Sequence, residues 1–204
     1  MASVSDEGRT HLPRSHAEAP VTDSPRLTVP VSDEDHVVGS ATAPVTLVQY
    51  GDYECPYCGA AYPIVKDVLN ELGDDVQFVF RNFPISGLHP HARHAAEAAE
   101  AAAEQGMFWE MHDYLYEHQT ELEDENLLDY AATLGLDVEL VERALETDAF
   151  DDRIQADFMS GVRSGVNGTP TFFINGRRYD RPWDKATLTS ALEDAVDGGR
   201  MESE

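Results

Sequence analysis

Residues 45–58, VTLVQYGDYECPYC, decide the fold of this chain. Five of the first six residues of this stretch are β-branched, apolar or aromatic, which is typical of a buried strand. Apolar residues then recur at helical spacing over residues 56–72, and Gly73 ends that pattern. A second apolar run follows at residues 76–80. A strand, a short helix and another strand in this order predict a βαβ unit with parallel strands and a right-handed crossover.

Beyond residue 89 the spacing of apolar residues is helical as far as about residue 166. An alanine-rich helix is expected up to Gly106, and others follow up to Gly135. Asp137 is expected to cap a further short helix, and Asp148 likewise to precede the last helix of this block. The sequence therefore predicts a block of helices after the βαβ unit.

The last part of the chain returns to strand periodicity. Residues 171–174 and 177–179 flank Asn175-Gly176, which indicates a hairpin with a type I′ turn. Trp183 and Asp184 introduce a final helix. The whole pattern predicts one α/β domain over residues 31–200, with a helical insertion at approximately 88–165. Residues 1–30, rich in Ser, Thr, Pro and Ala, are expected to form a disordered or peripheral leader.

Composition excludes several functions. Among 204 residues there are 39 Asp and Glu against 14 Lys and Arg, a net charge of −25. This balance argues against a nucleic-acid partner and against docking on anionic lipid. No apolar run is long enough for a membrane span, and the first 30 residues show no signal-peptide core, so a cytoplasmic location is expected, with export left open.

The acidic residues are spread over the folded part of the chain, because 32 of them follow residue 43. A surface that is acidic and poor in Lys favours a halophilic-type protein that is soluble in high salt, where self-repulsion is screened. A generally acidic cytosolic protein is the alternative.

Cys55 and Cys58 are the only cysteines in the chain, too few for a disulfide framework. Cys55 directly follows the first strand, and the N-terminus of a helix favours the thiolate form of a cysteine there. Cys58 lies one turn later on the same side, where it can resolve a mixed disulfide. Pro56 suits the first turn, because its missing N–H has no helical partner. The pattern favours redox chemistry.

A zinc site and a pair of inert buried cysteines are the alternatives to redox chemistry. A zinc site needs about four ligands, and the chain has no second CxxC. His89, His91 and His94 form the nearest cluster of ligand type, but they are interpreted as a polar helix start, since no carboxylate partner is placed by spacing. No metal is therefore expected. Inert buried cysteines are the second alternative, and the βαβ context disfavours them.

A Thr169-Pro170 step precedes the hairpin, where a cis proline would fit. With this step the chain resembles the DsbA family of thiol:disulfide oxidoreductases, within the thioredoxin fold. The resemblance covers residues 43 to about 196. The motifs that carry it are APVT at 43–46, DYECPYC at 52–58, FRNFP at 80–84, QGMFWEMH at 105–112 and GTPTFFING at 168–176.

The resemblance implies an α/β, thioredoxin-like fold in which the helical insertion caps the active site. It also implies that Cys55 is the nucleophile and Cys58 the resolving thiol, so that the cofactor is their own redox-active disulfide. A cis peptide at Thr169–Pro170 is implied beside the cysteines, with the Thr169 backbone able to pair with a substrate peptide. Pro56 and Tyr57 complete the active-site motif.

One position departs from the family pattern. Relatives often carry a buried acid six residues before the first cysteine, but here that residue is Gln49, which cannot take up a proton in the same way. Asp52 and Glu54 are candidates for proton handling instead, and a solvated acidic loop is the alternative. If both acids lie close to Cys55, their charge opposes the thiolate and makes the protein a weaker oxidant.

The expected activity is therefore disulfide exchange with protein thiols and disulfides, together with an unidentified redox partner. Two alternatives are a peptide-binding holdase with a structural disulfide, and a glutaredoxin-like reductase that uses a small thiol. The second shares the Cys-Pro-Tyr-Cys motif but belongs to much shorter chains. Direction, reduction potential, substrate and oligomeric state cannot be predicted from the sequence.

Overall fold

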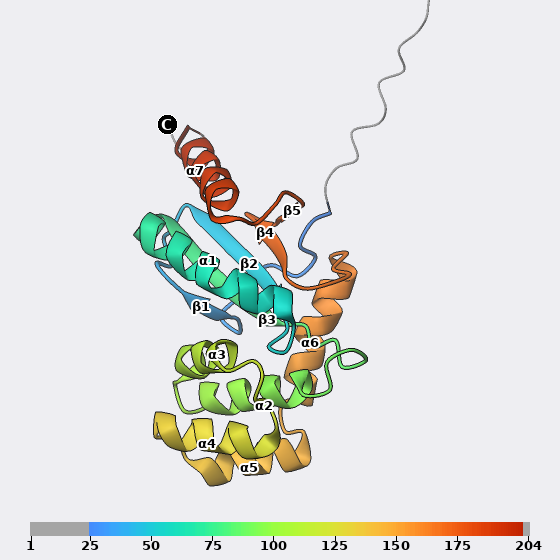
Figure 1. Cartoon of the computed structure of the whole chain (residues 1–204). Helices are drawn as coiled ribbons and strands as arrows, with labels where there is room; N and C mark the ends of the chain where they lie inside the picture. The colour runs from blue at the N-terminus through green and yellow to red at the C-terminus, as the bar shows by residue number, and fades with distance from the viewer. Residues whose placement is uncertain (1–24, 202–204) are drawn as a thin grey trace, which may run out of the picture.

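A five-stranded sheet with the strand order β1-β3-β2-β4-β5 forms the centre of the molecule (Figure 1). The computed structural model describes residues 25–201 of the chain. In this part, β2 and β3 run parallel and the other three pairs run antiparallel. The strands are β1 (His36–Val38), β2 (Val45–Gly51), β3 (Val76–Asn82), β4 (Thr171–Ile174) and β5 (Arg177–Tyr179).

The predicted βαβ unit is confirmed. It consists of β2, helix α1 (Pro56–Leu72), a 3₁₀ turn η1 (Gly73–Asp75) and β3. Pro56 takes the first helical position, where an N–H would lack a partner, and Gly73 ends α1 with a positive φ of 53°. Because α1 starts directly after β2, its N-terminal end and the cysteines lie at the end of the sheet that faces the inserted helices (Figure 1).

Both faces of the sheet are buried. Leu47 and Phe80 belong to the apolar cluster that contains the inner sides of α1 and of α7 (Lys185–Met201). Val48, Tyr50 and Phe173 form the cluster on the opposite face, against which Phe158 of α6 packs. The alternation of side chains along β2 thus supplies both cores and holds the strand rigidly between them.

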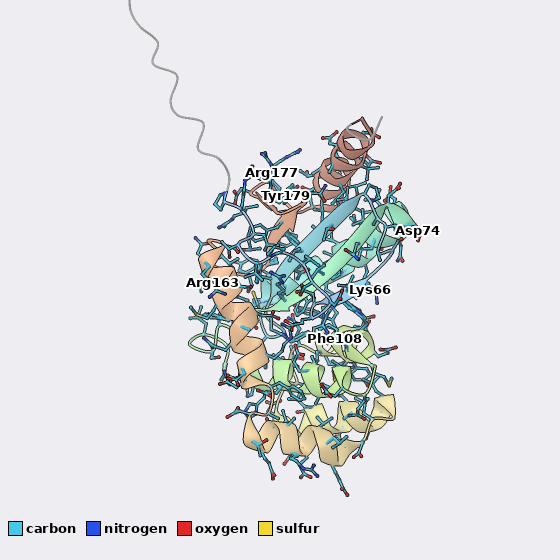
Figure 2. All side chains as sticks on the ribbon, turned by 180° about the vertical axis from the view of Figure 1, so that it is seen from behind. Lys66, Asp74, Phe108, Arg163, Arg177 and Tyr179 are labelled. Atoms are coloured by element: carbon cyan, nitrogen blue, oxygen red, sulfur yellow. The ribbon has the colours of Figure 1, made fainter. Side chains whose placement is uncertain are left out.

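Five helices lie between β3 and β4, which confirms the predicted helical insertion. This group is called the cap below, and it stacks against one end of the sheet (Figure 1). Phe108 lies where the sheet and the cap meet, stacked on His36 with 3.5 Å between ring centroids (Figure 2). The cap helices are α2 (Ala92–Ala103), α3 (Phe108–Glu117), α4 (Asp124–Leu134), α5 (Val138–Thr147) and α6 (Asp151–Arg163).

The helix boundaries inside the cap confirm one predicted N-cap and correct another. Asp137 caps α5 and accepts hydrogen bonds from the backbone of Glu139 and Leu140, at 3.1 and 3.4 Å. Asp148 does not start the next helix. It ends α5 with a φ of 47°, and α6 begins at Asp151. Aspartate tolerates this left-handed conformation because its short side chain hydrogen-bonds locally, and the same property makes it a common N-cap.

The hairpin of β4 and β5 is confirmed, with Asn175 and Gly176 at φ values of 47° and 73°. Residues 25–30, assigned to the leader by sequence, are bound to the core: 25–27 lie beside this hairpin, Thr28 bonds Ser164 at the end of α6, and the carbonyl oxygens of residues 29 and 30 accept from Arg81 of β3. The carbonyl oxygen of Pro25 accepts a hydrogen bond from the backbone N–H of Arg178 at 2.8 Å, and the Leu27 N–H donates to Gly176 at 2.9 Å. The rest of the expected leader, residues 1–24, lies outside the described residues.

Candidate functional site

The structure brings Cys55 and Cys58 next to Thr169 and Pro170, as the sequence predicts. Cys55 lies just before α1 and Cys58 lies in its first turn, and the two are 4% and 0% exposed. The Thr169–Pro170 peptide bond is cis. The thiol of Cys55 donates to the carbonyl oxygen of Thr169 at 3.4 Å, across a separation of 114 residues. The two segments therefore form one site at the N-terminus of α1.

The two thiols differ in acidity. A hydrogen bond from the Cys58 thiol lowers the pKa of Cys55 to about 5, although burial acts in the opposite direction; the side chain of Thr169 and the backbone of Cys58 and Tyr57 lower it further. Burial raises the pKa of Cys58 well above its ordinary value, and the hydrogen bond to Cys55 raises it further. At neutral pH the site therefore holds a thiolate at Cys55 and a protonated thiol at Cys58.

The rim of the site is apolar on the solvent side. Tyr57 is 67% exposed, and Leu88, in the segment between β3 and α2, is 74% exposed. Pro56 is also exposed. Large exposed apolar side chains next to a reactive group offer contacts to a partner rather than to the core.

Asp52 and Glu54 do not form a solvated acidic loop. The Asp52 side chain is buried and accepts three hydrogen bonds, from the backbone N–H groups of Glu54 (2.9 Å) and Ile85 (2.8 Å) and from Nδ1 of His89 (2.7 Å). Glu54 accepts from the backbone N–H of His91 at 2.6 Å and lies 3.0 Å from its Nδ1. Both acids are thus bound to the segment that leads into the cap.

The interpretation of the histidines as lacking carboxylate partners is therefore wrong. His89 pairs with Asp52, His91 with Glu54, and His94 with Asp124 at 2.6 Å. The first two pairs join residues 37 positions apart, a separation that spacing along one helix cannot reveal. Within residues 25–201 no group of His, Cys, Asp and Glu is arranged to hold a metal ion.

Gln49 is 2% exposed and lies on β2, two residues before Gly51. It lines a cavity of about 360 Å³ between α1 and α3, together with His112 and Tyr116. The hydroxyl of Tyr116 is buried and has no hydrogen-bond partner among the described residues. The position that often carries a buried acid in the family is thus occupied by a neutral amide beside a cavity whose lining is mostly apolar.

Sequence reasoning missed two cap residues that contact the active-site loop. Nε2 of Gln119 donates to the carbonyl oxygens of Tyr53 and Cys55, at 2.5 and 3.0 Å. Nδ1 of His112 lies 3.1 Å from the Tyr53 hydroxyl, and burial lowers the pKa of His112 to about 3. The one local sign of the Gln119 contact is the glycine at position 59. A Cβ there would lie 1.9 Å from Oε1 of Gln119, so the close approach of the two segments requires a residue without a side chain.

A polarised CxxC at the start of the helix in a βαβ unit, facing a cis proline, is the arrangement of a thiol–disulfide oxidoreductase. The comparisons with known proteins agree. The family model described as Thioredoxin matches residues 31–194. The chain therefore belongs to the thioredoxin family, in its DsbA-like class of thiol–disulfide oxidoreductases.

Two solved structures carry this comparison. BdbD from Bacillus subtilis superposes with a TM-score of 0.74 at 26% identity, covering 85% of this chain and 97% of that one. A thioredoxin-like oxidoreductase from Silicibacter pomeroyi superposes with a TM-score of 0.71 at 29% identity, covering 83% of this chain and 94% of that one. Both likenesses extend over nearly the whole of the neighbour, including its helical insertion.

Among curated proteins the chain is similar to part of longer ones. It is 48% identical over 179 residues to a protein of Salinispora tropica named Na(+)/H(+) antiporter NhaA 3, which covers 87% of this chain but 27% of the relative. A relative from Herminiimonas arsenicoxydans, named Na(+)/H(+) antiporter NhaA, is 44% identical, with 86% and 28% covered. The chain thus spans about a quarter of each relative, and the name of the longer protein is not carried over to it. Over residues 25–201, no helix combines the length and apolar character that crossing a membrane requires.

Proposed function

We propose that this chain exchanges disulfides with cysteine pairs of protein substrates through the Cys55–Cys58 couple. The observation that carries the proposal is the difference in acidity between two adjacent thiols that contact the Thr169–Pro170 segment. A nucleophile must be a thiolate at working pH, whereas the thiol that resolves the intermediate must wait until the first bond has formed.

In the reducing direction, the Cys55 thiolate attacks one sulfur of a substrate disulfide. A mixed disulfide forms between Cys55 and the substrate, and the other substrate sulfur leaves as a thiolate that takes up a proton. Cys58 then loses its proton and attacks the Cys55 sulfur, which releases the second substrate thiol and leaves the Cys55–Cys58 disulfide. Two electrons have passed from the cysteine pair to the substrate. Oxidation of a substrate dithiol follows the same steps in reverse.

The residues around the cysteines have distinct roles in this proposal. The Thr169 backbone pairs with the extended peptide that carries the substrate cysteine, next to Pro170. Tyr57 supplies an apolar contact at the rim, and Pro56 holds the first turn of α1. In this proposal Asp52 and Glu54 handle the proton of Cys58, and the backbone of Asp52 hydrogen-bonds the Cys58 thiol. Gln49 is a neutral amide and takes no part in the proton transfer.

Direction is read from the reduction potential of the couple. A value near about −270 mV, as in thioredoxin, assigns a reductase, and a value near about −120 mV, as in DsbA, assigns an oxidase. The measurement belongs in molar salt, since the acidic composition favours a halophilic-type surface. Cytoplasmic residence stays a prediction, and a cysteine-accessibility assay in intact cells of the source organism tests it.

The test of the activity is insulin reduction and refolding of reduced ribonuclease with the wild-type protein and the Cys55→Ser and Cys58→Ser variants. We expect both activities to fall to background in Cys55→Ser. The Cys58→Ser variant should accumulate a mixed disulfide with the substrate, because it lacks the resolving thiol. Full activity of Cys55→Ser would overturn the proposal.

Two further readouts separate the alternative functions. Suppression of substrate aggregation that is equal in wild type and Cys55→Ser, without any disulfide exchange, would assign a peptide-binding holdase. Turnover that requires glutathione and ignores protein disulfides would assign a glutaredoxin-like reductase. Exchange with protein disulfides in the absence of glutathione supports the proposal against both.

A further inference from the structure

A buried carboxylate lies in the loop that carries the nucleophile, three residues before it. The Asp52 side chain is fully buried, and the backbone carbonyl oxygen of Asp52 accepts a hydrogen bond from the Cys55 N–H at 3.2 Å. A negative charge near a thiolate raises the pKa of the thiol, and burial strengthens the repulsion because little water screens it. Considered alone, Asp52 therefore opposes the thiolate that the proposed reaction needs.

His89 supplies the compensating group. Its Nδ1 lies 2.7 Å from Oδ2 of Asp52, the same oxygen that accepts the Ile85 N–H at 2.8 Å, and its ring is 17% exposed. The backbone N–H groups of Leu88 and His89 donate to the Ile85 carbonyl oxygen, at 2.8 and 3.0 Å. Residues 85–89 thus form one backbone turn that contacts the Asp52 carboxylate twice. The N–H of Ile85 donates to it at the start of the turn, and the imidazole of His89 contacts it at the end.

The charges around the ring favour the imidazolium form. Burial lowers the pKa of His89, but the hydrogen bond and charge of Asp52, and the charges of Cys55 and Glu54, together raise it above its ordinary value. Glu54 is itself bound to His91. Coupling between two titrating groups is reciprocal, so a thiolate that favours the proton on His89 is favoured by that proton to the same extent.

We propose that His89 is a positioning residue that holds its proton against Asp52, cancels the buried charge and so keeps Cys55 as a thiolate. The inference rests on the proposed role of Cys55 as the nucleophile. It adds a residue of the segment that leads into the cap to the chemistry of the thioredoxin core. The arrangement also fixes the conformation of the loop, because the Asp52 side chain accepts hydrogen bonds from the backbone N–H groups of Glu54 and Ile85.

The test is a thiol titration of the reduced protein, followed by the ultraviolet absorbance of the thiolate, with Cys58→Ser as the background so that one thiol is observed. In His89→Gln the amide can still donate to Asp52, but it carries no charge. We expect the pKa of Cys55 to rise by about one unit, a tenfold loss of thiolate at a pH below both values. An unchanged pKa would overturn the proposal.

Two further variants distinguish charge compensation from a structural role. The double variant Asp52→Asn with His89→Gln removes both members of the pair and should return the Cys55 pKa close to its original value. If the pKa of the double variant stays as high as in His89→Gln alone, the charge argument is wrong. The matched control is His91→Gln, since Glu54 is partly exposed. A shift in this control as large as in His89→Gln would contradict a specific role for His89.

The titration tests the role of His89, and the activity assays test the proposed function, so each proposal can be refuted without the other. The absorbance reads the ionisation of Cys55 whether or not the protein exchanges disulfides with any substrate. If the pKa of Cys55 rises as expected in His89→Gln but the wild type exchanges no disulfides, the proposed function is wrong and the electrostatic coupling stands. Disulfide exchange with an unshifted pKa would do the reverse.

Discussion

The cap meets the thioredoxin core at two polar junctions whose charges are arranged in opposite senses. At the front junction, beside the cysteines, the core loop supplies the acids, and the cap together with the segment that leads into it supplies histidines and an amide. At the rear junction the cap supplies the acids, and β1, β3 and Arg153 of α6 supply the donors. The front junction consists of Asp52, Tyr53, Glu54, His89, His91, His112 and Gln119, and the rear junction of His36, Asn82, Glu100, Arg153 and Asp157.

The rear junction is built on regular elements. Glu100 of α2 accepts from Nδ2 of Asn82 at 2.7 Å and lies 2.9 Å from Nε2 of His36, and Asp157 of α6 accepts the Asn82 N–H at 3.0 Å. Both carboxylates are at most 5% exposed. The front junction is made largely by loop residues, and the His91 side chain is 39% exposed. The contrast indicates that the rear contacts fix the cap while the front contacts adjust the chemistry of Cys55.

The largest effect on stability is expected from breaking the rear junction. Glu100→Gln replaces one carboxylate oxygen by an NH₂ group, which sets a donor against either Nε2 of His36 or Nδ2 of Asn82 inside the protein. We expect a loss of about 3 kcal/mol in the free energy of unfolding, measured by urea denaturation of the reduced protein. Glu104→Gln, at the exposed C-terminal end of the same helix, is the matched control and should change stability little. Equal losses in the two variants would show that Glu100 has no special role.

A smaller effect is expected at the front junction from Gly59→Ala. The new Cβ would lie 1.9 Å from Oε1 of Gln119, so the Gln119 amide must leave the carbonyl oxygens of Tyr53 and Cys55. We expect a loss of about 2 kcal/mol in the free energy of unfolding. In Gln119→Ala the same alanine at position 59 should cost less, because the clash is gone. Additive losses in the double variant would contradict the contact.

The smallest effect is a pH dependence of opposite sign at the two junctions. The pKa of His112 is about 3 in the folded chain, so only the unfolded chain binds a proton there between about pH 6.5 and 3. The free energy of unfolding therefore decreases as the pH is lowered through this range. Burial raises the pKa of Asp157 to about 6, so the folded chain binds its proton first and stability rises as pH falls from about 6 to 4.

Urea denaturation between pH 4 and 7 separates these two contributions. His112→Gln should remove part of the acid loss seen in the wild type, and Asp157→Asn should make that loss steeper. We expect slopes that differ in sign between the two variants when each is referred to the wild type. Parallel curves for all three proteins would show that neither group titrates as its burial requires.

Local sequence signals predicted the elements and the redox centre. The strand at 45–50, the CxxC, the Asn175-Gly176 turn and the Thr169-Pro170 step each depend on neighbouring residues, so each was recognisable from a short stretch. The front junction was not, because His89 and Gln119 reach their partners across 37 and 64 or more residues. Strand β1 was also missed, since its three residues form a strand only by pairing with β3.

The packing of Phe83 beside Val166 has a consequence for how such proteins diversify. Phe83 leaves the end of β3 and Val166 leads back toward β4, and both are buried in one cluster with Tyr50 and Phe173. The N–H of Phe83 is also bound to Gly51 at 2.7 Å. Since the chain departs and returns at adjoining points, helices between them can be gained, lost or exchanged without rethreading a strand. Evolution can therefore remodel the substrate-facing part of the molecule while the redox couple is inherited intact.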